Sequence, residues 1–138
     1  MFKCKTDLRK FLLAGEAVVT IKSLRSGEHL TLRFRHTENR AGAYFIDALR
    51  GPDNTRDYVY VAYCSVNGGG ALRLRKVVEG SALRAHLEWF LDAVWSEEDG
   101  LFRAAEVRHA GRCGRCGRLL TTPESIDTGL GPTCSGRG

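Results

Sequence analysis

The sequence predicts an α+β fold, with an antiparallel sheet of about five strands, helices on one face of the sheet, and a small cysteine-containing module at the C-terminus. Three observations predict it. Several short segments alternate apolar and polar residues with the two-residue period of strands, and one longer segment repeats apolar residues at helical spacing. In addition, three of the five cysteines lie within the last 26 residues of the 138-residue chain.

The N-terminal part is expected to form one short helix and two strands. The helix falls in residues 6–15, where Thr6 or Asp7 can cap its start and a glycine can end it. Two strand-like segments follow in residues 16–23 and 28–35, joined by a turn that contains "RSG". Apolar and polar residues alternate in the second segment, which predicts one buried and one solvated face.

Three more strands and a longer helix are expected in the middle of the chain. The strands fall in residues 43–51, 57–64 and 71–78, and the second of them is apolar on both alternations. That pattern favours a central strand covered on both faces. The helix falls in residues 81–100, with Ser81 as a candidate cap. Its apolar stripe comprises Leu83, Leu87, Phe90 and Val94.

A linker strand in residues 104–111 leads to the cysteines, which predicts an α+β domain in residues 1–100 and a module in residues 101–138 packed on it. The net charge is +5. Residues 1–100 hold 15 Lys and Arg against 13 Asp and Glu, and residues 101–138 hold 6 against 3. The module is therefore the more basic part, which is compatible with a nucleic-acid or acidic protein partner.

Four residues of the module have the spacing of metal ligands, His109-x3-Cys113-x2-Cys116-x17-Cys134. Zinc accepts three cysteines and one histidine tetrahedrally, and structural zinc sites usually fill all four positions with protein ligands. We therefore expect a zinc knuckle that holds a structural Zn²⁺ through the three cysteines, with His109 as the fourth ligand. Other groups could complete the site instead: Cys4, Cys64, Asp127 or water.

Cys4 and Cys64 are otherwise expected to be reduced, apolar core residues. An odd number of cysteines, three of them at metal-like spacing, is typical of a protein in a reducing compartment. No apolar segment approaches the roughly 18–20 residues needed to span a bilayer, and the N-terminus lacks the apolar segment of a signal peptide. The sequence thus predicts a soluble cytoplasmic protein with no membrane partner.

Between Cys116 and Cys134 the sequence predicts a short helix. Thr122 followed by Pro123 is a favourable helix start, and Gly129 can end the helix in the left-handed conformation. About one and a half turns are too few for a helix to be stable alone in water. We therefore expect the module to be folded with zinc and loose without it.

The segment "GRCGRCGRLLTTPESIDTGLGPTC" resembles DUF6011, a small zinc-binding segment common in phage and mobile-element proteins. The shared pattern is a cysteine pair followed by "GR-x-L", "PES" and "G-x-GP-x-C". The matching residues are Cys113, Cys116, Gly117, Arg118, Leu120, Pro123, Glu124, Ser125, Gly129, Gly131, Pro132 and Cys134. The stretches "FLLAG" and "GPDNTRDYVYV" also look like phage-type proteins that carry this tail. The resemblance implies zinc and a mobile-element origin, and it implies no activity.

The sequence contains no catalytic constellation that we could identify. It lacks a G-x-S-x-G elbow, a phosphate-binding G-x-x-x-x-G-K loop and an H-E-x-x-H helix. Treble-clef nucleases need further histidines after the knuckle, and none follows Cys134. Zinc deaminases need a glutamate two residues after a histidine such as His109, where this chain has glycine. We therefore expect that the protein is not an enzyme.

Arginines are the candidate binding residues, because they lie on two expected strands and around the cysteine pair. If those strands share a sheet, their arginines could form one basic face that binds phosphates. The candidates are Arg33, Arg35, Arg73, Arg75, Arg112, Arg115 and Arg118. Tyrosines of the 57–64 segment could stack on bases if they are exposed: Tyr58, Tyr60 and Tyr63. The alternative is that the arginines are ordinary solvated side chains of a sheet face with no binding role, and that the tyrosines belong to the core.

The function expected from these features is non-enzymatic binding of nucleic acid or of a host nucleoprotein or defence complex. The alternative is a steric inhibitor of an antiviral defence system, similar to an anti-CRISPR protein, that binds a host protein directly. Trp89 and Trp95 are its candidate interface anchors. A structural accessory subunit is a third possibility. The oligomeric state is left open.

Overall fold

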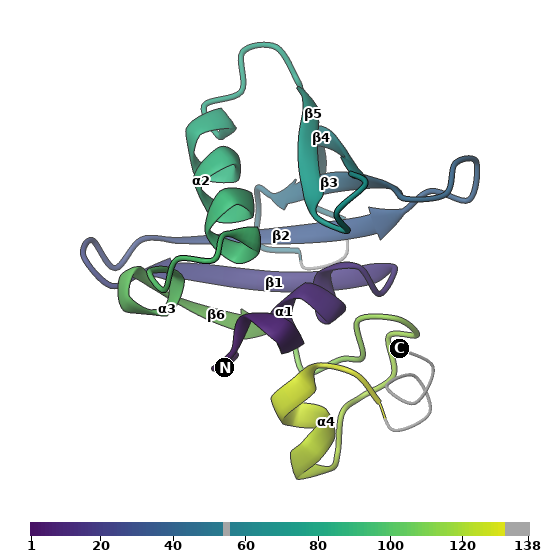
Figure 1. The fold of residues 1–138 in the computed structure, drawn as a ribbon, viewed down its shortest axis with the longest axis vertical. Helices are drawn as coiled ribbons and strands as arrows, with labels where there is room; N and C mark the ends of the chain where they lie inside the picture. Colours follow the sequence, from purple (N-terminus) through teal and green to yellow (C-terminus); the bar gives the residue numbers. More distant parts are fainter. Residues whose placement is uncertain (54–55, 132–138) are drawn as a thin grey trace.

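The computed structural model describes residues 1–53 and 56–131, which form one antiparallel sheet and four helices (Figure 1). The six strands have the order β5-β4-β3-β2-β1-β6 in an open sheet. In chain order they are β1 (Glu16–Ser23), β2 (His29–His36), β3 (Ala43–Leu49), β4 (Tyr58–Val66), β5 (Leu72–Val77) and β6 (Ala105–His109). The predicted α+β class is confirmed.

The sheet has one strand more than expected because the linker strand, β6, pairs with β1 along its whole length. Val107 lies opposite Ile21, and His109 lies opposite Val19. The first part of residues 101–138, which were expected to form a separate module, therefore belongs to the sheet. The part that extends beyond the sheet begins after His109.

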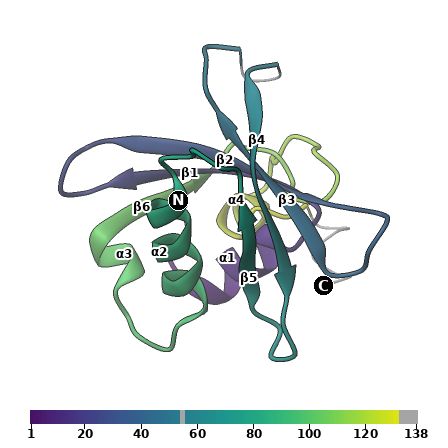
Figure 2. The ribbon, with the colours of Figure 1, turned by 90° about the horizontal axis from the view of Figure 1, so that it is seen from above.

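The helices are α1 (Lys5–Leu12), α2 (Arg84–Trp95), α3 (Leu101–Ala104) and α4 (Pro123–Thr128). Helices α1, α2 and α3 lie on one side of the curved sheet, as predicted (Figure 2). No helix of the described residues is both long and apolar enough to cross a membrane.

The core lies between these helices and the inner face of the sheet. All four residues of the stripe expected for α2 are buried, and Leu91 joins them. On β2, the buried residues Leu32 and Phe34 alternate with arginines, as predicted. Burying each such side chain stabilises the fold by roughly 1.5–3 kcal/mol. The alternation therefore decides which face of the sheet the helices cover.

Strand β4 is not covered on both faces, so that expectation was wrong. Tyr60 is 41% exposed, on the face away from the helices. The pairing of β4 with β3 shifts between Ile46 and Asp47, which leaves Val61 and Ala62 buried in succession. A bulge of this kind interrupts the two-residue period. The segment consequently looks apolar on both alternations.

Two helix starts also differ from the prediction. Helix α1 begins at Lys5 with Cys4 at the cap position, because the Phe2 N–H donates to the Val107 carbonyl and fixes the chain ahead of the helix. Cys4 is exposed there, so its expected core position was wrong, whereas Cys64 is buried as predicted. Helix α2 begins at Arg84, and the hydroxyl of Ser81 accepts the N–H of a residue just before it.

Cationic side chains of α1 hold the C-terminal end of α2. Arg9 Nε donates to the Val94 carbonyl at 2.8 Å, and Lys5 Nζ donates to the carbonyls of Ser96 and Glu98 at 2.6 Å each. The last carbonyls of a helix have no partner within it, and cations interact favourably with that end. These bonds fix α1 against α2.

We predict that Arg9→Ala lowers the free energy of unfolding by about 1–2 kcal/mol, because it removes a charged donor from the end of α2. Urea unfolding at neutral pH measures the effect. Lys3→Ala is the matched control, since Lys3 is exposed and lies just outside the same helix. Equal unfolding midpoints for the two variants would contradict this account of α2.

Candidate functional site

The two described cysteines of the predicted metal site lie in one tight hairpin, the cysteine turn (residues 112–119). Arg112 and Leu119 pair across its base. The Cys113 N–H donates to the Arg118 carbonyl at 2.8 Å, and the Gly117 N–H donates to the Cys113 carbonyl at 2.9 Å. Gly117 has φ 76°, which favours glycine there. The backbone thus brings the two sulfurs to one side of the hairpin.

The sulfur of Cys113 is buried and surrounded by donors. Burial alone would raise the pKa of the Cys113 thiol. Backbone N–H groups of Gly131, Cys116 and Arg115, together with the Cys116 thiol, donate to this sulfur and lower its pKa to about 7. The turn therefore stabilises a thiolate near neutral pH, which is the form that binds metals.

His109 lies at the end of β6 with both ring nitrogens hydrogen-bonded. The Gly111 N–H donates to Nδ1 at 2.9 Å, so Nε2 carries the proton and donates to the Ile126 carbonyl of α4. The ring also contacts the rings of Phe2 and Phe11, with centroids 5.6 and 6.0 Å apart. In this arrangement His109 connects β6, α1 and α4.

The remaining candidate ligands lie apart from the cysteine turn or outside the described residues. Cys134 is outside them. Cys64 belongs to the core, where burial raises the pKa of its thiol to about 12 and its thiol donates to the Tyr44 carbonyl. Cys4 is exposed at the start of α1. Within residues 1–53 and 56–131, no three His, Cys, Asp or Glu side chains are grouped closely enough to hold a metal ion.

Helix α4 follows the cysteine turn and has the ends that the sequence predicts. Thr122 precedes its first residue, and the Thr122 hydroxyl accepts the Ser125 N–H at 3.2 Å. The Ser125 hydroxyl in turn accepts the Thr122 N–H, which completes a reciprocal cap. Gly129 ends the helix with φ 76°. These predictions are confirmed.

Two glycines let the cysteine turn and α4 pack closely on α1. A Cβ atom on Gly114 would lie 2.7 Å from the Phe11 ring, and one on Gly129 would lie 2.5 Å from it. The Gly114 N–H donates to the Gly129 carbonyl at 2.9 Å, and the Gly114 carbonyl accepts the Glu16 N–H at 2.7 Å. The sequence analysis identified Gly129 as a helix end but did not identify its contact, or that of Gly114, with Phe11.

A second group of polar side chains lies on the face of the sheet away from the helices, here called the outer face. Asp47 of β3 is only 2% exposed, and it accepts hydrogen bonds from Arg33 and Arg35 of β2. Burial alone would raise the pKa of Asp47, but the hydrogen bonds and charges of Arg35 and Arg33 outweigh it, and the pKa is lowered. The two arginines are thereby held in fixed positions.

Aromatic rings surround these arginines on the outer face. The Arg33 guanidinium lies 4.3 Å from the centre of the Tyr58 ring, and that of Arg35 lies 5.3 Å from the Phe45 ring. Phe45 contacts two further rings of β4 at centroid distances of 5.6 and 5.8 Å: Tyr60 and Tyr63. The sequence indicated the tyrosines as stacking candidates and did not indicate Phe45.

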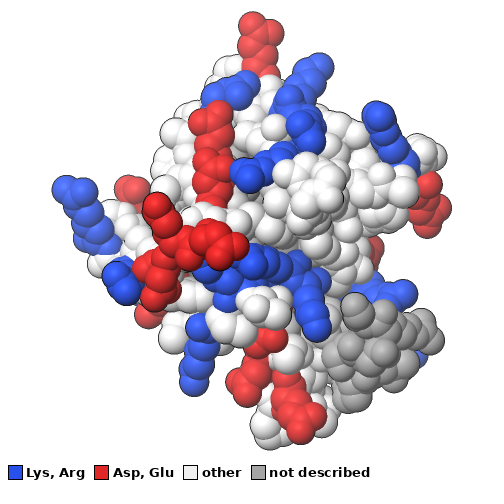
Figure 3. All heavy atoms as spheres, viewed as in Figure 1, with Lys and Arg blue, Asp and Glu red and all other residues white. Residues whose placement is uncertain are grey.

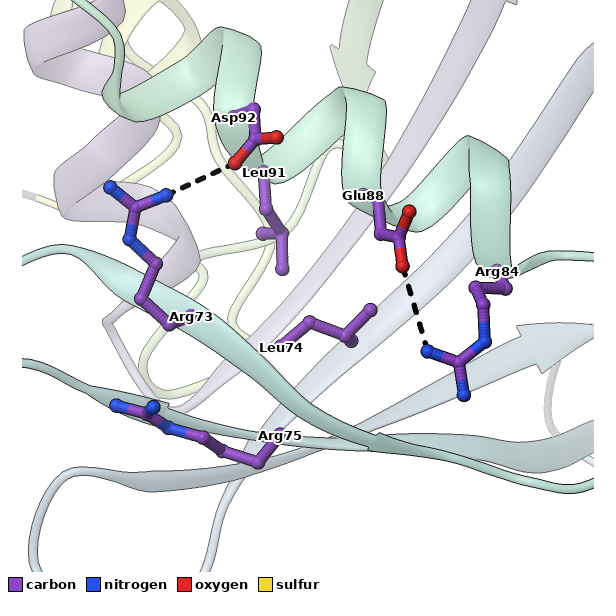
Figure 4. Close-up of a pocket in the computed structure, with 7 residues that line it drawn as sticks. All are labelled: Arg73, Leu74, Arg75, Arg84, Glu88, Leu91 and Asp92. Atoms are coloured by element: carbon purple, nitrogen blue, oxygen red, sulfur yellow. Dashed lines mark hydrogen bonds and ion pairs between the residues drawn. The ribbon is translucent and has the colours of Figure 1, made fainter.

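The arginines expected to form one face are divided by the structure. Arg75 joins the outer face, where its Nε donates to the Ser65 hydroxyl at 2.7 Å. Arg73 reaches in the other direction and pairs with Asp92 of α2 at 3.0 Å (Figure 4). Acidic and basic side chains are interspersed on the side that carries the helices (Figure 3). The four strand arginines are therefore not gathered on one surface.

The three arginines of the cysteine turn differ in their contacts. Arg112 donates to the Gly117 carbonyl within the turn at 3.2 Å, and Arg118 is exposed. Arg115 lines a groove between the turn and the end of α1.

Fold and site together define an α+β protein with an open antiparallel sheet, an aromatic outer face and a cysteine-containing C-terminal segment. Residues 103–137 of the chain match the model of DUF6011, a family of unknown function. No curated protein and no solved structure matches the chain. The match covers the cysteine turn and α4, and it supports the resemblance found for this segment.

We predict that Asp47→Asn lowers the free energy of unfolding at pH 7 by about 2 kcal/mol, because the variant leaves two arginines without their carboxylate. The value is below that of a fully buried pair, since both arginines are partly exposed to water. The folded-state pKa of Asp47 is lowered, so its contribution is present above the unfolded value of about 3.9 and is lost as the pH falls through the folded value.

Chemical unfolding between pH 3 and pH 7 checks this prediction. The difference in unfolding free energy between the native protein and Asp47→Asn should be constant above about pH 5 and shrink below about pH 4. Asp53→Asn, a change to a far more exposed aspartate, is the control. A difference that does not change with pH would exclude the charge of Asp47 as its cause.

Proposed function

We propose that the protein binds single-stranded nucleic acid on the outer face and catalyses no reaction. The observation that carries the proposal is the group of aromatic rings and fixed guanidinium groups on a sheet face opposite the one that α1, α2 and α3 cover (Figure 2). Bases stack on exposed aromatic rings, and each such stack contributes about 1–3 kcal/mol with little dependence on base identity. Duplex DNA hides its base faces, so the proposal is limited to single strands.

The arginines supply the contacts to phosphate. A guanidinium has five N–H groups; Arg33 donates one of them to Asp47 and Arg35 donates two. The remaining donors of both arginines, and those of Arg75 other than its Nε, have no hydrogen-bond partner among the described residues and can bind phosphate oxygens. Asp47 cancels one of the positive charges, so we expect a shallow dependence of affinity on salt.

A second candidate function is binding of a host protein through α2, as an inhibitor of antiviral defence or an accessory subunit. The observation in its favour is Trp89, which is 44% exposed on α2, on the opposite side of the sheet from the aromatic rings. Trp95 packs against the core instead. A single exposed tryptophan is a smaller feature than the outer face, so this candidate ranks second.

We also propose that the C-terminal segment is a zinc knuckle holding one structural Zn²⁺. The donors around the Cys113 sulfur fit a thiolate ligand, and Cys116 lies in the same turn. Gly131 is next to this sulfur, and three residues of chain span at most about 10 Å, which is enough to bring Cys134 to it. His109 is the proposed fourth ligand. Binding through Nε2 would move the ring proton to Nδ1, so the ring would give up both the Ile126 carbonyl and the Gly111 N–H and would turn toward the two cysteines. The metal would supply the stability that a helix as short as α4 lacks.

For nucleic acid, we predict that Tyr60→Ala weakens binding of a labelled 12-nucleotide single strand by about tenfold, the loss of one base stack. Fluorescence anisotropy at low salt measures the dissociation constant. Trp89→Ala is the matched control, because Trp89 has similar exposure on the other side of the sheet. A loss of affinity in Trp89→Ala alone would shift the proposal to α2, and no binding at low salt would exclude nucleic acid as the ligand.

For the metal, we predict one zinc ion per chain in protein purified without chelators. Cys116→Ser and Cys134→Ser should each remove it, because a structural site needs all of its ligands. Cys64→Ser should keep it, since Cys64 lies in the core. Native mass spectrometry with elemental analysis gives the stoichiometry. Absence of zinc from the unaltered protein, or its retention in Cys116→Ser, would refute the site.

A further inference from the structure

A groove of about 540 Å³ lies where the cysteine turn meets the end of α1 and the ends of β2 and β3. Its volume falls within the range of pockets that hold small molecules. The lining residues come from all of these segments: Lys10, Leu13, Ala14, Gly15, His36, Tyr44, Arg115 and Leu130. None of them is acidic.

The polar side chains of the groove are basic and come from three separate segments. Lys10 belongs to α1, His36 to β2, and Arg115 to the cysteine turn. No described carboxylate forms an ion pair with Lys10 or Arg115. On the same helix Lys5 and Arg9 donate to α2, so they have a structural role that Lys10 lacks. Two cations and an imidazole thus line one hollow, and no carboxylate of residues 1–53 and 56–131 pairs with either cation.

The rest of the groove is apolar and has a fixed ring in its wall. Leu13, Ala14 and Leu130 are all shielded from water at least in part. The Tyr44 hydroxyl donates to the Leu13 carbonyl at 2.8 Å, which holds the tyrosine ring in place. The exposed His36 ring packs edge-on against the Tyr44 ring at a centroid distance of 5.2 Å, so an aromatic ring and apolar side chains line the groove together. This lining suits a ligand with a flat apolar part in addition to its negative charge.

We propose that this groove binds a phosphate monoester attached to a flat apolar group, as in a nucleoside monophosphate or the terminal nucleotide of a strand. Such a phosphate carries a charge of about −1.5 to −2 at pH 7 and three acceptor oxygens, which suit Lys10, Arg115 and an N–H of His36. The groove is distinct from the outer face. His36 and Tyr44 are opposite each other in the β2–β3 pairing, one position beyond Arg35 and Phe45, so their side chains lie on the other side of the sheet.

An NMR titration of the full ¹⁵N-labelled chain tests the proposal, with thymidine 5′-monophosphate as the probe. We expect saturable shifts in the backbone amides of residues 10–15, 36 and 115. Thymidine and inorganic phosphate, which each carry half of the ligand, should bind about tenfold more weakly or worse. Absence of saturable shifts, or shifts confined to the outer face, would overturn the proposal.

The variant Lys10→Gln/Arg115→Gln should weaken the binding of thymidine 5′-monophosphate by about tenfold or more, the loss of two charge-assisted contacts. The control variant is Lys3→Gln/Arg118→Gln. It removes the same charge from the chain just before α1 and from the same turn, at residues that do not line the groove, and it should leave binding unchanged. Equal loss in both variants would reduce the effect to net charge and refute the site. The dispersion of each variant's amide spectrum shows that it is folded.

Two further titrations separate the sources of the phosphate and separate this site from the outer face. A 5′-phosphorylated tetrathymidylate that binds more tightly than its unphosphorylated form, and loses this advantage in Lys10→Gln/Arg115→Gln, assigns the groove to strand ends. Equal affinity for both forms, with tight binding of the mononucleotide, assigns it to free nucleotides. Tyr60→Ala should leave mononucleotide binding unchanged whether or not the outer face binds nucleic acid.

Discussion

The contact of Phe11 with the C-terminal segment is the constraint on which the rest of this structure depends. Phe11 is completely buried, and the glycines of the cysteine turn and of the end of α4 both lie directly against its ring. The ring of His109 packs on the same side chain. A six-residue helix and a hairpin are too small to be stable alone, so this contact gives them a fixed position relative to the sheet. The groove exists because the cysteine turn is held there.

A second constraint acts on the outer face, where a buried carboxylate must have partners. An unpaired ionised aspartate as buried as Asp47 would cost several kcal/mol. Arg33 and Arg35 remove that cost, and in doing so they become fixed above two aromatic rings. The same pairing that stabilises the sheet therefore orders two cations in advance of any ligand. It also limits their charge, which is why we expect stacking to contribute more than electrostatics to binding there.

The sequence predicted what depends on neighbours along the chain and missed what depends on register. Alternation identified the strands, and the Thr122–Pro123 start and Gly129 end identified α4, because those signals are local. Asp47 was not singled out in the sequence, because its partners follow only from the alignment of β2 with β3. The cap of α1 depends on a bond from Phe2 to Val107, more than a hundred residues away. The bond of His109 to Ile126 of α4 was also missed, because it joins residues 17 apart and follows only from the packing of α4 against the end of β6.

The two proposed binding surfaces differ in how they depend on the metal. The rings and arginines of the outer face stand on β2, β3, β4 and β5, which pair with each other in order without a strand from the C-terminal segment between them. Arg115 and Leu130 of the groove stand on the segment that contains the proposed zinc ligands. A ligand that binds only the folded form of a segment stabilises that form, and the segment's other ligand gains affinity in turn. On the proposed assignments, zinc and the phosphate ligand of the groove therefore strengthen each other, whereas nucleic-acid binding to the outer face is independent of zinc.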